Sequence, residues 1–338
     1  MYRNPLLENS NNRTKRRKLS EDEVDAPEVT NIKSLIEIAQ RKIEYRNLDS
    51  KTLWRILPSL KQLNNMIGME DLKTTMFYQI IYYLQNMHKK GDDYLHTVIT
   101  GPPGTGKTSV AEIIGNIYKN IGVLSKRGKF KIAKREDFIA PYLGQTAIKT
   151  RKLLESCIGG VLFIDEAYAL GPGQQDKDSF SKEAIDTLNV FLSEHKKDFC
   201  CIIAGYEDDI KKCFFRINKG LERRFQWIHR INNYSENQLA LIMIKMINDI
   251  EWNINVSLEE LTTFLKTHIS CFKNFGGDIE TFLSKCKMTH ARRVFSLEDK
   301  HRFILTIADL ECAIKMSEQH NNEEESAWSK PPPFGMYV

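Results

Sequence analysis

The eight residues Gly101-Pro-Pro-Gly-Thr-Gly-Lys-Thr108 decide the fold of this chain, because they match the phosphate-binding loop pattern G-x-x-x-x-G-K-[ST]. Glycines allow the backbone to curl so that its N–H groups face a phosphate at the start of a helix. We expect the Lys107 ammonium to neutralise phosphate charge and the Thr108 hydroxyl to ligate Mg²⁺. The pattern predicts a nucleotide-binding loop made of Gly101, Pro102, Pro103, Gly104, Thr105, Gly106, Lys107 and Thr108.

The residues on either side of this loop give it a fitting context. A β-rich run at residues 96–100 precedes it, and an amphipathic helical pattern follows, with apolar residues at Val110, Ile113, Ile114 and Ile117. The alternative, a glycine turn that happens to contain a lysine, gives no reason for a strand before it and a helix after it.

A second motif, Val161-Leu-Phe-Ile-Asp-Glu166, supplies two carboxylates. Its four apolar residues predict a buried strand, and Asp165 and Glu166 follow at the carboxyl end, where ligands of open α/β sheets bind. We expect Asp165 to hold Mg²⁺ through water and Glu166 to polarise the attacking water as general base. An exposed Asp-Glu pair without a function is the alternative, and the upstream phosphate-binding loop disfavours it.

Strand and helix patterns alternate in the middle of the chain, which predicts a doubly wound, mainly parallel α/β sheet. The strand candidates are residues 96–100, 130–133, 161–164, 199–204 and 227–231. After about Asn232 no strand candidate follows. We therefore predict an α/β nucleotide-binding domain at 93–232, a small all-α domain at 233–318 and a flexible tail at 319–338.

The first 92 residues divide into a polar arm and a helical segment. Residues 1–30 hold the basic cluster Lys15 to Lys18 and then an acidic block, with few large apolar residues, which predicts a disordered arm. The cluster is either a nuclear-import signal or part of a solvated tail. Helices leading into the α/β domain are predicted over 31–92, with a first stripe from Ile32 to Ile43, then 51–65 interrupted at Pro58, then 69–88.

Composition excludes several classes of protein. The chain has 338 residues, 41% of them hydrophobic, and 49 Lys and Arg against 44 Asp and Glu, a formal charge of +5. It contains no apolar stretch long enough to span a membrane and begins with no secretory signal pattern. Seven cysteines without C-x-x-C spacing favour reduced thiols in the cytoplasm or nucleus over disulfides or a zinc site. The mild charge, taken as dispersed through the folded part, does not indicate a nucleic-acid partner.

In combination these motifs resemble those of AAA+ ATPases, and more narrowly of the CbxX/CfxQ family, which is related to stage V sporulation protein K. The resemblance extends from about Leu63 to Val294 and includes residues 66–73, 101–108, 142–150, 160–168, 183–185 and 204–206. It implies a parallel-sheet P-loop NTPase domain followed by a helical lid, with ATP and Mg²⁺ bound and ATP hydrolysed to ADP and phosphate. It also implies a self-assembled ring, usually of six subunits, that remodels a protein in a chaperone-like way.

Three further catalytic candidates are carried over from this resemblance. Arg224 aligns with the arginine that AAA+ proteins present to the γ-phosphate of the neighbouring subunit, a role that suits an always-charged planar group. Arg223 is the second candidate, because the sequence does not show which of two adjacent arginines points across, and two surface arginines are the alternative. Tyr206 stands where many AAA+ proteins carry an asparagine sensor, which makes it a candidate for orienting the water.

The lid departs from the family pattern at one position. Members commonly carry an arginine that touches nucleotide before the penultimate helix, and Gly277 aligns with it here. Either Arg292 or Arg293 takes over this contact, or the coupling between lid and nucleotide is weaker.

Tyr142, Leu143 and Gly144 lie between the second strand candidate and a helix that starts near Thr146, where AAA+ translocases place an aromatic loop lining the central pore. An aromatic ring suits gripping a polypeptide of varied sequence, because it offers a large contact area at low rotamer cost. A lysine or arginine nearby (Lys149 or Arg151) would favour acidic segments. The alternative is that Tyr142 packs against its own domain.

The sequence therefore leads us to expect a ring-forming motor that acts on an unidentified protein. A nucleotide-gated assembly scaffold with low turnover is the alternative. A nucleic-acid remodeller ranks last, because it would need a basic groove with interleaved aromatic residues. Neither nucleic acid nor a membrane is an expected partner.

Overall fold

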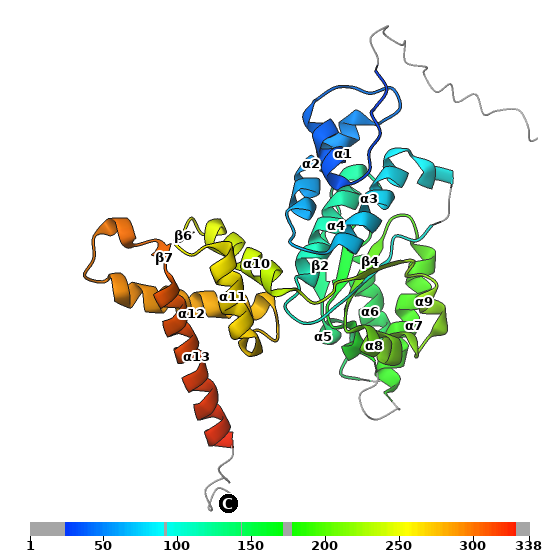
Figure 1. The fold of residues 1–338 in the computed structure, drawn as a ribbon. Coiled ribbons are helices and arrows are strands. Elements are labelled where there is room, and N and C mark those ends of the chain that lie inside the picture. The colour runs from blue at the N-terminus through cyan, green and yellow to red at the C-terminus, as the bar shows by residue number, and fades with distance from the viewer. Residues whose placement is uncertain (1–23, 91–92, 143, 172–177, 329–338) are drawn as a thin grey trace, which may run out of the picture.

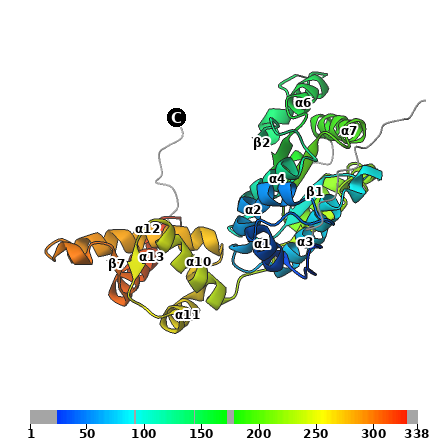
Figure 2. The same ribbon diagram turned by 90° about the horizontal axis from the view of Figure 1, so that it is seen from above.

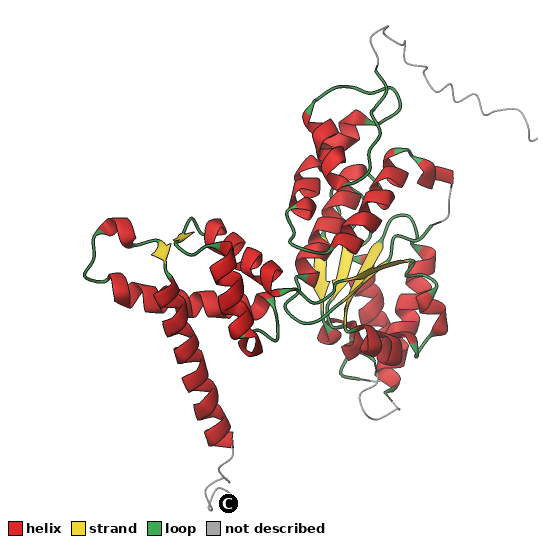
Figure 3. Cartoon of the chain, viewed as in Figure 1, coloured by secondary structure: helices red, strands yellow, loops and turns green. Residues whose placement is uncertain are grey.

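The structure is a computed structural model that describes residues 24–90, 93–142, 144–171 and 178–328. Lys15 to Lys18, Leu143 and the last ten residues of the predicted tail lie outside the described residues. The described chain forms an α/β domain carrying an N-terminal helical layer, followed by a C-terminal helical lid (Figures 1 and 3). Within this part of the chain no helix has the length and apolarity needed to cross a membrane.

A five-stranded sheet in the order β2-β3-β4-β1-β5 forms the centre of the α/β domain, and all its strand pairs are parallel. The five predicted strands are confirmed, as β1 Thr97–Thr100, β2 Phe130–Ala133, β3 Val161–Ile164, β4 Cys200–Gly205 and β5 Trp227–Arg230. Every residue of β1, β3 and β4 is buried, whereas the edge strands β2 and β5 keep exposed residues. Parallel strands need crossover connections, which here are helices covering both faces of the sheet.

Alternation along the central strands divides the core into two layers. On β1, Ile99 packs with the N-terminal helices and α4 (Lys107–Ile121), and Val98 packs on the opposite face with residues of α6 (Thr146–Glu155) and α7 (Ser179–Glu194). Successive side chains of a strand point to opposite faces. A strand covered on both faces therefore reads as an unbroken apolar run, which is why the motif before Asp165 was recognisable.

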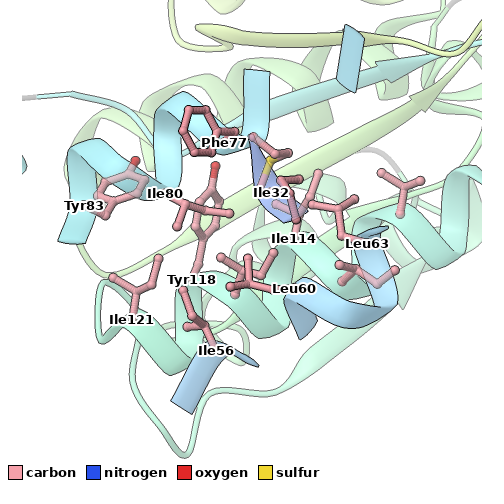
Figure 4. Packing of buried hydrophobic residues seen from close by; sticks show 14 of the residues in the cluster. Ile32, Ile56, Leu60, Leu63, Phe77, Ile80, Tyr83, Ile114, Tyr118 and Ile121 are labelled. Carbon is pink, nitrogen blue, oxygen red and sulfur yellow. The ribbon is translucent and has the colours of Figure 1, made fainter. Parts of the chain in front are cut away.

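The N-terminal segment adds α1 (Ile32–Gln40), α2 (Ser50–Asn64) and α3 (Glu70–Leu84) to one of these layers. Figure 4 shows Leu60 of α2, Ile80 of α3 and Tyr118 of α4 in one cluster, and all three are fully buried. This layer covers the helix that follows the P-loop and so supports the loop from behind.

Helix α2 runs through Pro58 without a break, so the predicted interruption is wrong. Proline removes one backbone hydrogen bond of a helix. Ile56 and Leu60 on either side are fully buried, and this packing holds the helical path across the proline.

The ordered chain begins before the predicted boundary at residue 30. Val24 forms a parallel bridge with Tyr45, the Ala26 N–H donates to Asn47 Oδ1 at 2.8 Å, and Val29 packs against the core. The prediction of disorder is wrong for residues 24–30, because Ala26 and Val29 pack against the helical layer. Ile43, by contrast, lies beyond the end of α1 and is 44% exposed.

The lid consists of α10 (Glu236–Asp249), α11 (Leu258–Thr267), α12 (Gly276–Val294) and α13 (Ile307–Trp328) around a core of its own. It lies to one side of the α/β domain (Figure 2). Two short parallel strands, β6 (Asn253–Ile254) and β7 (Ile304–Leu305), pair within it. The prediction of a lid without strands is therefore wrong, because two-residue strands leave no periodic pattern to detect.

Helix α13 continues to Trp328, ten residues beyond the predicted end of the lid at residue 318. The short elements complete the described chain: η1 Met87–Lys90, α5 Arg135–Phe138, η2 Ala167–Leu170, α8 Glu207–Asp209, η3 Ile210–Phe215, α9 Lys219–Glu222, η4 Ile269–Cys271 and η5 Asp299–His301.

Candidate nucleotide-binding site

The P-loop connects the carboxyl end of β1 to the start of α4. Gly104 and Gly106 adopt φ values of +67° and +83°, in the left-handed region that favours glycine. Gly106 is the N-cap of α4 and has no side chain to cap the helix. The first N–H groups of α4 are therefore left for an anionic ligand, with the positive end of the helix dipole behind them.

Lys107, in the first turn of α4, points back over this loop. Its ammonium donates to the carbonyl oxygens of Gly101 at 3.1 Å and Pro102 at 2.7 Å. Burial lowers the pKa of Lys107, and the charges of Asp165 and Glu166 oppose that shift. The ammonium therefore lies within electrostatic reach of both predicted acidic residues.

A cavity of about 250 Å³ opens beside the loop. Its lining combines the P-loop with residues that follow β3 and β4: Pro103 to Thr108, Asp165, Glu166, Tyr168, Gly205 and Tyr206. Because all strands of the sheet are parallel, their carboxyl ends meet at this one edge. The structure thus brings together most of the predicted loop residues, both predicted carboxylates and Tyr206.

Glu166 occupies an uncommon backbone conformation at φ 50° and ψ 48°. A non-glycine residue in this region costs on the order of 1 kcal/mol, and such residues cluster at functional sites. The Glu166 N–H donates to Asp165 Oδ1 at 3.1 Å, and the Glu166 side chain is exposed to the cavity. The turn that follows β3 therefore separates the two carboxylates, one half-buried and one accessible.

Tyr168 was not singled out from the sequence, yet it forms one wall of the cavity. Burial and the neighbouring Glu166 charge raise the pKa of Tyr168 to about 12. Its ring stacks on the Tyr206 ring with centroids 5.8 Å apart, and the Tyr206 ring centroid lies 5.8 Å from the Lys107 ammonium. The sequence signal for Tyr168 was its place at the end of the family motif at residues 160–168, which gave it no role of its own.

Arg223 and Arg224 are absent from the lining of this cavity. The Arg224 guanidinium is held within its own domain, where Nε donates to Ser193 Oγ at 2.7 Å and Nη1 to the Gly220 carbonyl at 2.6 Å. Arg223 is exposed, and no other described residue forms an ion pair or side-chain hydrogen bond with it. The structure therefore separates one positioned arginine from one free arginine at the surface.

The lid contacts the P-loop through backbone atoms. The N–H of Gly276, at the start of α12, donates to the Gly104 carbonyl at 3.1 Å. A Cβ on Gly104 would lie 1.9 Å from the Asn274 carbonyl oxygen, so only glycine fits there. Tyr234, another residue missed in the sequence, adds a hydrogen bond from its hydroxyl to the Thr105 carbonyl at 3.0 Å.

Arg292 and Arg293 do not replace the missing lid arginine. Both lie in the last turn of α12, about 23 Å along the helix from Gly277 at its first turn. Arg293 is also committed to Asp309, with Nε to Oδ1 at 2.7 Å. Of the two alternatives, replacement by either arginine is therefore wrong, because α12 carries both away from the P-loop, and weaker coupling between lid and nucleotide stays a prediction.

The segment with Tyr142 and Gly144 connects α5 to α6. Tyr142 is 69% exposed, which rules out the alternative that it packs against its own domain. Gly144 has a φ of +78°, as a sharp turn requires. The base of the loop is fixed, because the Lys149 ammonium donates to the carbonyls of Glu136 at 2.6 Å and Ile139 at 2.8 Å.

Comparison with known proteins agrees with this geometry. Residues 97–232 match the family described as "ATPase family associated with various cellular activities (AAA)". The crystal structure of the FIGL-1 AAA domain in complex with ADP has a TM-score of 0.55 and 16% identity, covering 81% of this chain and 90% of that one. At this identity the likeness shows the fold alone. The fold and the sequence match together define a AAA+ ATPase.

Relatives of known sequence narrow the class. The chain is 38% identical over 270 residues to a putative cfxQ-like protein of Acanthamoeba polyphaga mimivirus, covering 78% of this chain and 66% of that one. It is 39% identical over 214 residues to stage V sporulation protein K of Bacillus subtilis, covering 61% and 65%. It is 31% identical over 261 residues to the protein CfxQ homolog of Pyropia yezoensis, covering 74% and 85%. The chain belongs to the CbxX/CfxQ family of AAA+ ATPases, and it spans just under two thirds of the length of the first two relatives.

Proposed function

We propose that this chain is an ATP-hydrolysing motor that assembles into a ring and remodels a protein substrate. The observation that best supports the proposal is the convergence of the P-loop, Asp165 and Glu166 on one cavity at the carboxyl edge of the sheet. Phosphate-binding N–H groups and a carboxylate acceptor on one cavity are what in-line attack by water on a γ-phosphate requires.

The oxygen donors present fit Mg²⁺. The Thr108 hydroxyl and the Asp165 carboxylate both line the cavity, and hard oxygen ligands of this kind suit that ion. Bound there, Mg²⁺ would offset charge on the phosphates. The Lys107 ammonium adds a further positive charge once it turns from the loop carbonyls to a phosphate.

Glu166 is the residue proposed to take the proton from the attacking water. Its side chain is accessible from the cavity, and its backbone is held in the strained turn after β3, so its carboxylate is presented toward bound nucleotide. Tyr206 and Tyr168 line the same cavity, where the Tyr206 hydroxyl is proposed to orient the water.

Arg224 and Arg223 are proposed to act on the site of a neighbouring subunit. Neither lines the cavity of its own chain. Arg224 is the stronger candidate, because Ser193 and Gly220 fix its direction at low entropy cost. A positively charged group supplied in trans would make hydrolysis depend on assembly.

Mixing two inactive variants tests this proposal. Glu166→Gln should keep ATP binding and lower kcat about 10²-fold or more. Arg224→Ala should lower kcat with nucleotide affinity nearly unchanged, and Arg223→Ala, the second candidate, should lower kcat less if Arg224 is the finger. If the site is shared, mixed Glu166→Gln and Arg224→Ala subunits recover turnover that neither has alone. A mixture shown by mass photometry to co-assemble, yet without recovery, would count against a finger in trans.

The lid contact favours a second candidate function, a nucleotide-gated scaffold with low turnover. Gly276 and Gly277 meet the P-loop with backbone atoms, and no lid arginine reaches it from within the described residues. Steady-state phosphate release separates the two functions. A scaffold would assemble with ATP but show the same slow turnover in the parent protein and in Glu166→Gln.

A further inference from the structure

We propose that the surface formed by β2 and α6 binds acidic segments of a polypeptide. The inference rests on the proposed function, in which the substrate is a protein, and adds the chemical class of the segment that this chain engages. We call this surface the basic face and define it by Lys129, Lys131, Lys134, Lys149 and Lys152, all of which are exposed.

Positive charge is concentrated on this part of the chain. Residues 126–152 contain nine basic and two acidic residues, a net charge of +7, whereas the whole chain carries +5. The remainder of the protein is therefore slightly acidic. The expectation that basic charge is dispersed through the folded part is wrong, because β2, α5 and α6 bring these residues together.

Two arginines next to the basic face form ion pairs with carboxylates, whereas within the described chain the lysines of the face do not. Arg151 pairs with Glu155 at 3.1 Å and with Glu194 at 3.0 Å, and Arg135 pairs with Asp178. Of the two residues expected to favour acidic segments, Arg151 is thus already paired, which leaves Lys149. None of the five lysines forms an ion pair with any described residue, so no carboxylate within the described chain neutralises their charges, although Lys149 and Lys131 donate hydrogen bonds to neutral oxygens.

Two contacts join the lysines into one surface. Lys149, Lys152 and Ser156 follow each other at spacings of three and four on α6, which places them on one side of the helix. The Lys131 ammonium, from β2, donates to Ser156 Oγ at 3.3 Å. The lysines therefore extend from α6 to the edge strand β2, and Figure 2 shows these two elements next to each other.

The same surface leads to the proposed substrate loop. The Lys149 ammonium lies against the Glu136 and Ile139 carbonyls, at the base of the loop that exposes Tyr142. A polypeptide held by the Tyr142 ring would have its neighbouring residues within reach of these lysines.

Several features favour a polypeptide over a nucleic acid. Lysines supply most of its exposed charge, with Arg127 the one exposed arginine of residues 126–152, and a lysine lacks the planar fork with which arginine recognises phosphates and bases. Tyr142 is its one strongly exposed aromatic residue among those described, whereas single-stranded nucleic acids need successive stacking platforms. Exposed Ile148, at 58%, suits aliphatic side chains, and β2 is an edge strand whose outer side has no strand partner in the described sheet.

Fluorescence anisotropy with the full chain, Mg²⁺ and a non-hydrolysable ATP analogue tests the proposal. The probes are a labelled peptide in which Glu alternates with Ser, its Glu→Gln counterpart, and single-stranded DNA of equal charge. K131E/K152E reverses two charges on the basic face. K266E/K315E reverses two exposed, unpaired lysines of the lid and is the matched control. Thermal melting confirms that both variants fold.

The acidic peptide should bind more tightly than its Gln counterpart, with affinity falling as salt is raised. Reversing one charge about 6 Å from a carboxylate in water lowers the affinity about tenfold. We therefore expect K131E/K152E to weaken binding of the acidic peptide at least tenfold and K266E/K315E to weaken it less than twofold. An equal loss of affinity in both variants, or equal affinity for the Gln peptide, would overturn the proposed preference for acidic segments but would not contradict the proposed ATPase motor. Tighter binding of DNA would overturn the protein substrate itself.

Discussion

Replacing Gly276 by alanine should weaken the contact between the lid and the P-loop, while the same change at Gly277 should not. A Cβ at Gly276 would lie 2.8 Å from the Gly104 carbonyl oxygen, whereas a Cβ at Gly277 would lie 3.6 Å from Gly104 Cα, an ordinary contact. Overpacking of this kind costs about 1–3 kcal/mol, and the lost hydrogen bond from the Gly276 N–H about 1 kcal/mol. The gain of alanine over glycine in a helix offsets at most about 1 kcal/mol of this cost. The net effect, about 1–3 kcal/mol, corresponds to a shift of about tenfold or more toward the lid released from the P-loop.

Hydrogen–deuterium exchange of the peptides that contain Gly104 and Gly276 measures this shift. Gly276→Ala should speed their exchange about tenfold, and a fluorescent ATP analogue should dissociate faster by a similar factor. Gly277→Ala should leave both unchanged or slightly slowed, because the first turn of α12 becomes a better helix. Equal protection in the two variants, or a larger effect at Gly277, would refute the idea that the Gly276–Gly104 contact seats the lid.

Three other predictions follow from the same structure. Lys107→Ala should abolish binding of a fluorescent ATP analogue, because the positive charge at the phosphates is lost; retained affinity would mean that the loop amides suffice. Burial lowers the pKa of His96 from 6.5 to about 3 and that of His229 to about 4. The free energy of unfolding should therefore be highest above pH 6.5, where both rings are neutral in either state, and should fall as the pH drops below 6.5. At pH 5 each histidine should lower the free energy of unfolding, measured by urea denaturation, by on the order of 2 kcal/mol. His229→Leu should make this free energy less dependent on pH without breaking a hydrogen bond, since neither ring nitrogen of His229 has a hydrogen-bond partner among the described residues. Tyr142→Ala should keep ATP binding, assembly and the melting temperature but remove substrate-stimulated turnover; undiminished stimulation would show that Tyr142 does not grip the substrate.

The features that could be predicted from the sequence are those that depend on a local pattern of residues. The five strands appear in the sequence because a strand buried on both faces requires consecutive apolar residues, and the P-loop appears because its glycines are needed for backbone conformations that other residues avoid. The same reasoning failed at Pro58, where packing of neighbouring residues overrode the helix-breaking tendency of proline. It also failed at residues 24–30, whose few apolar side chains are enough to cover a helical layer that the sequence does not show.

By itself the sequence determined the fold class, the family and the residues at the carboxyl edge of β1 and β3, because each depends on neighbours within a few positions. Only the tertiary structure decided that Arg224 is positioned and Arg223 free, and that α12 carries Arg292 and Arg293 away from the P-loop. Only the tertiary structure brought the lysines of β2 and α6 together on one surface and brought the Gly276 N–H to the Gly104 carbonyl. These features rest on contacts between segments far apart in the chain. Spacing along a sequence records helical and strand periods, whereas such contacts arise only when the separate elements pack together.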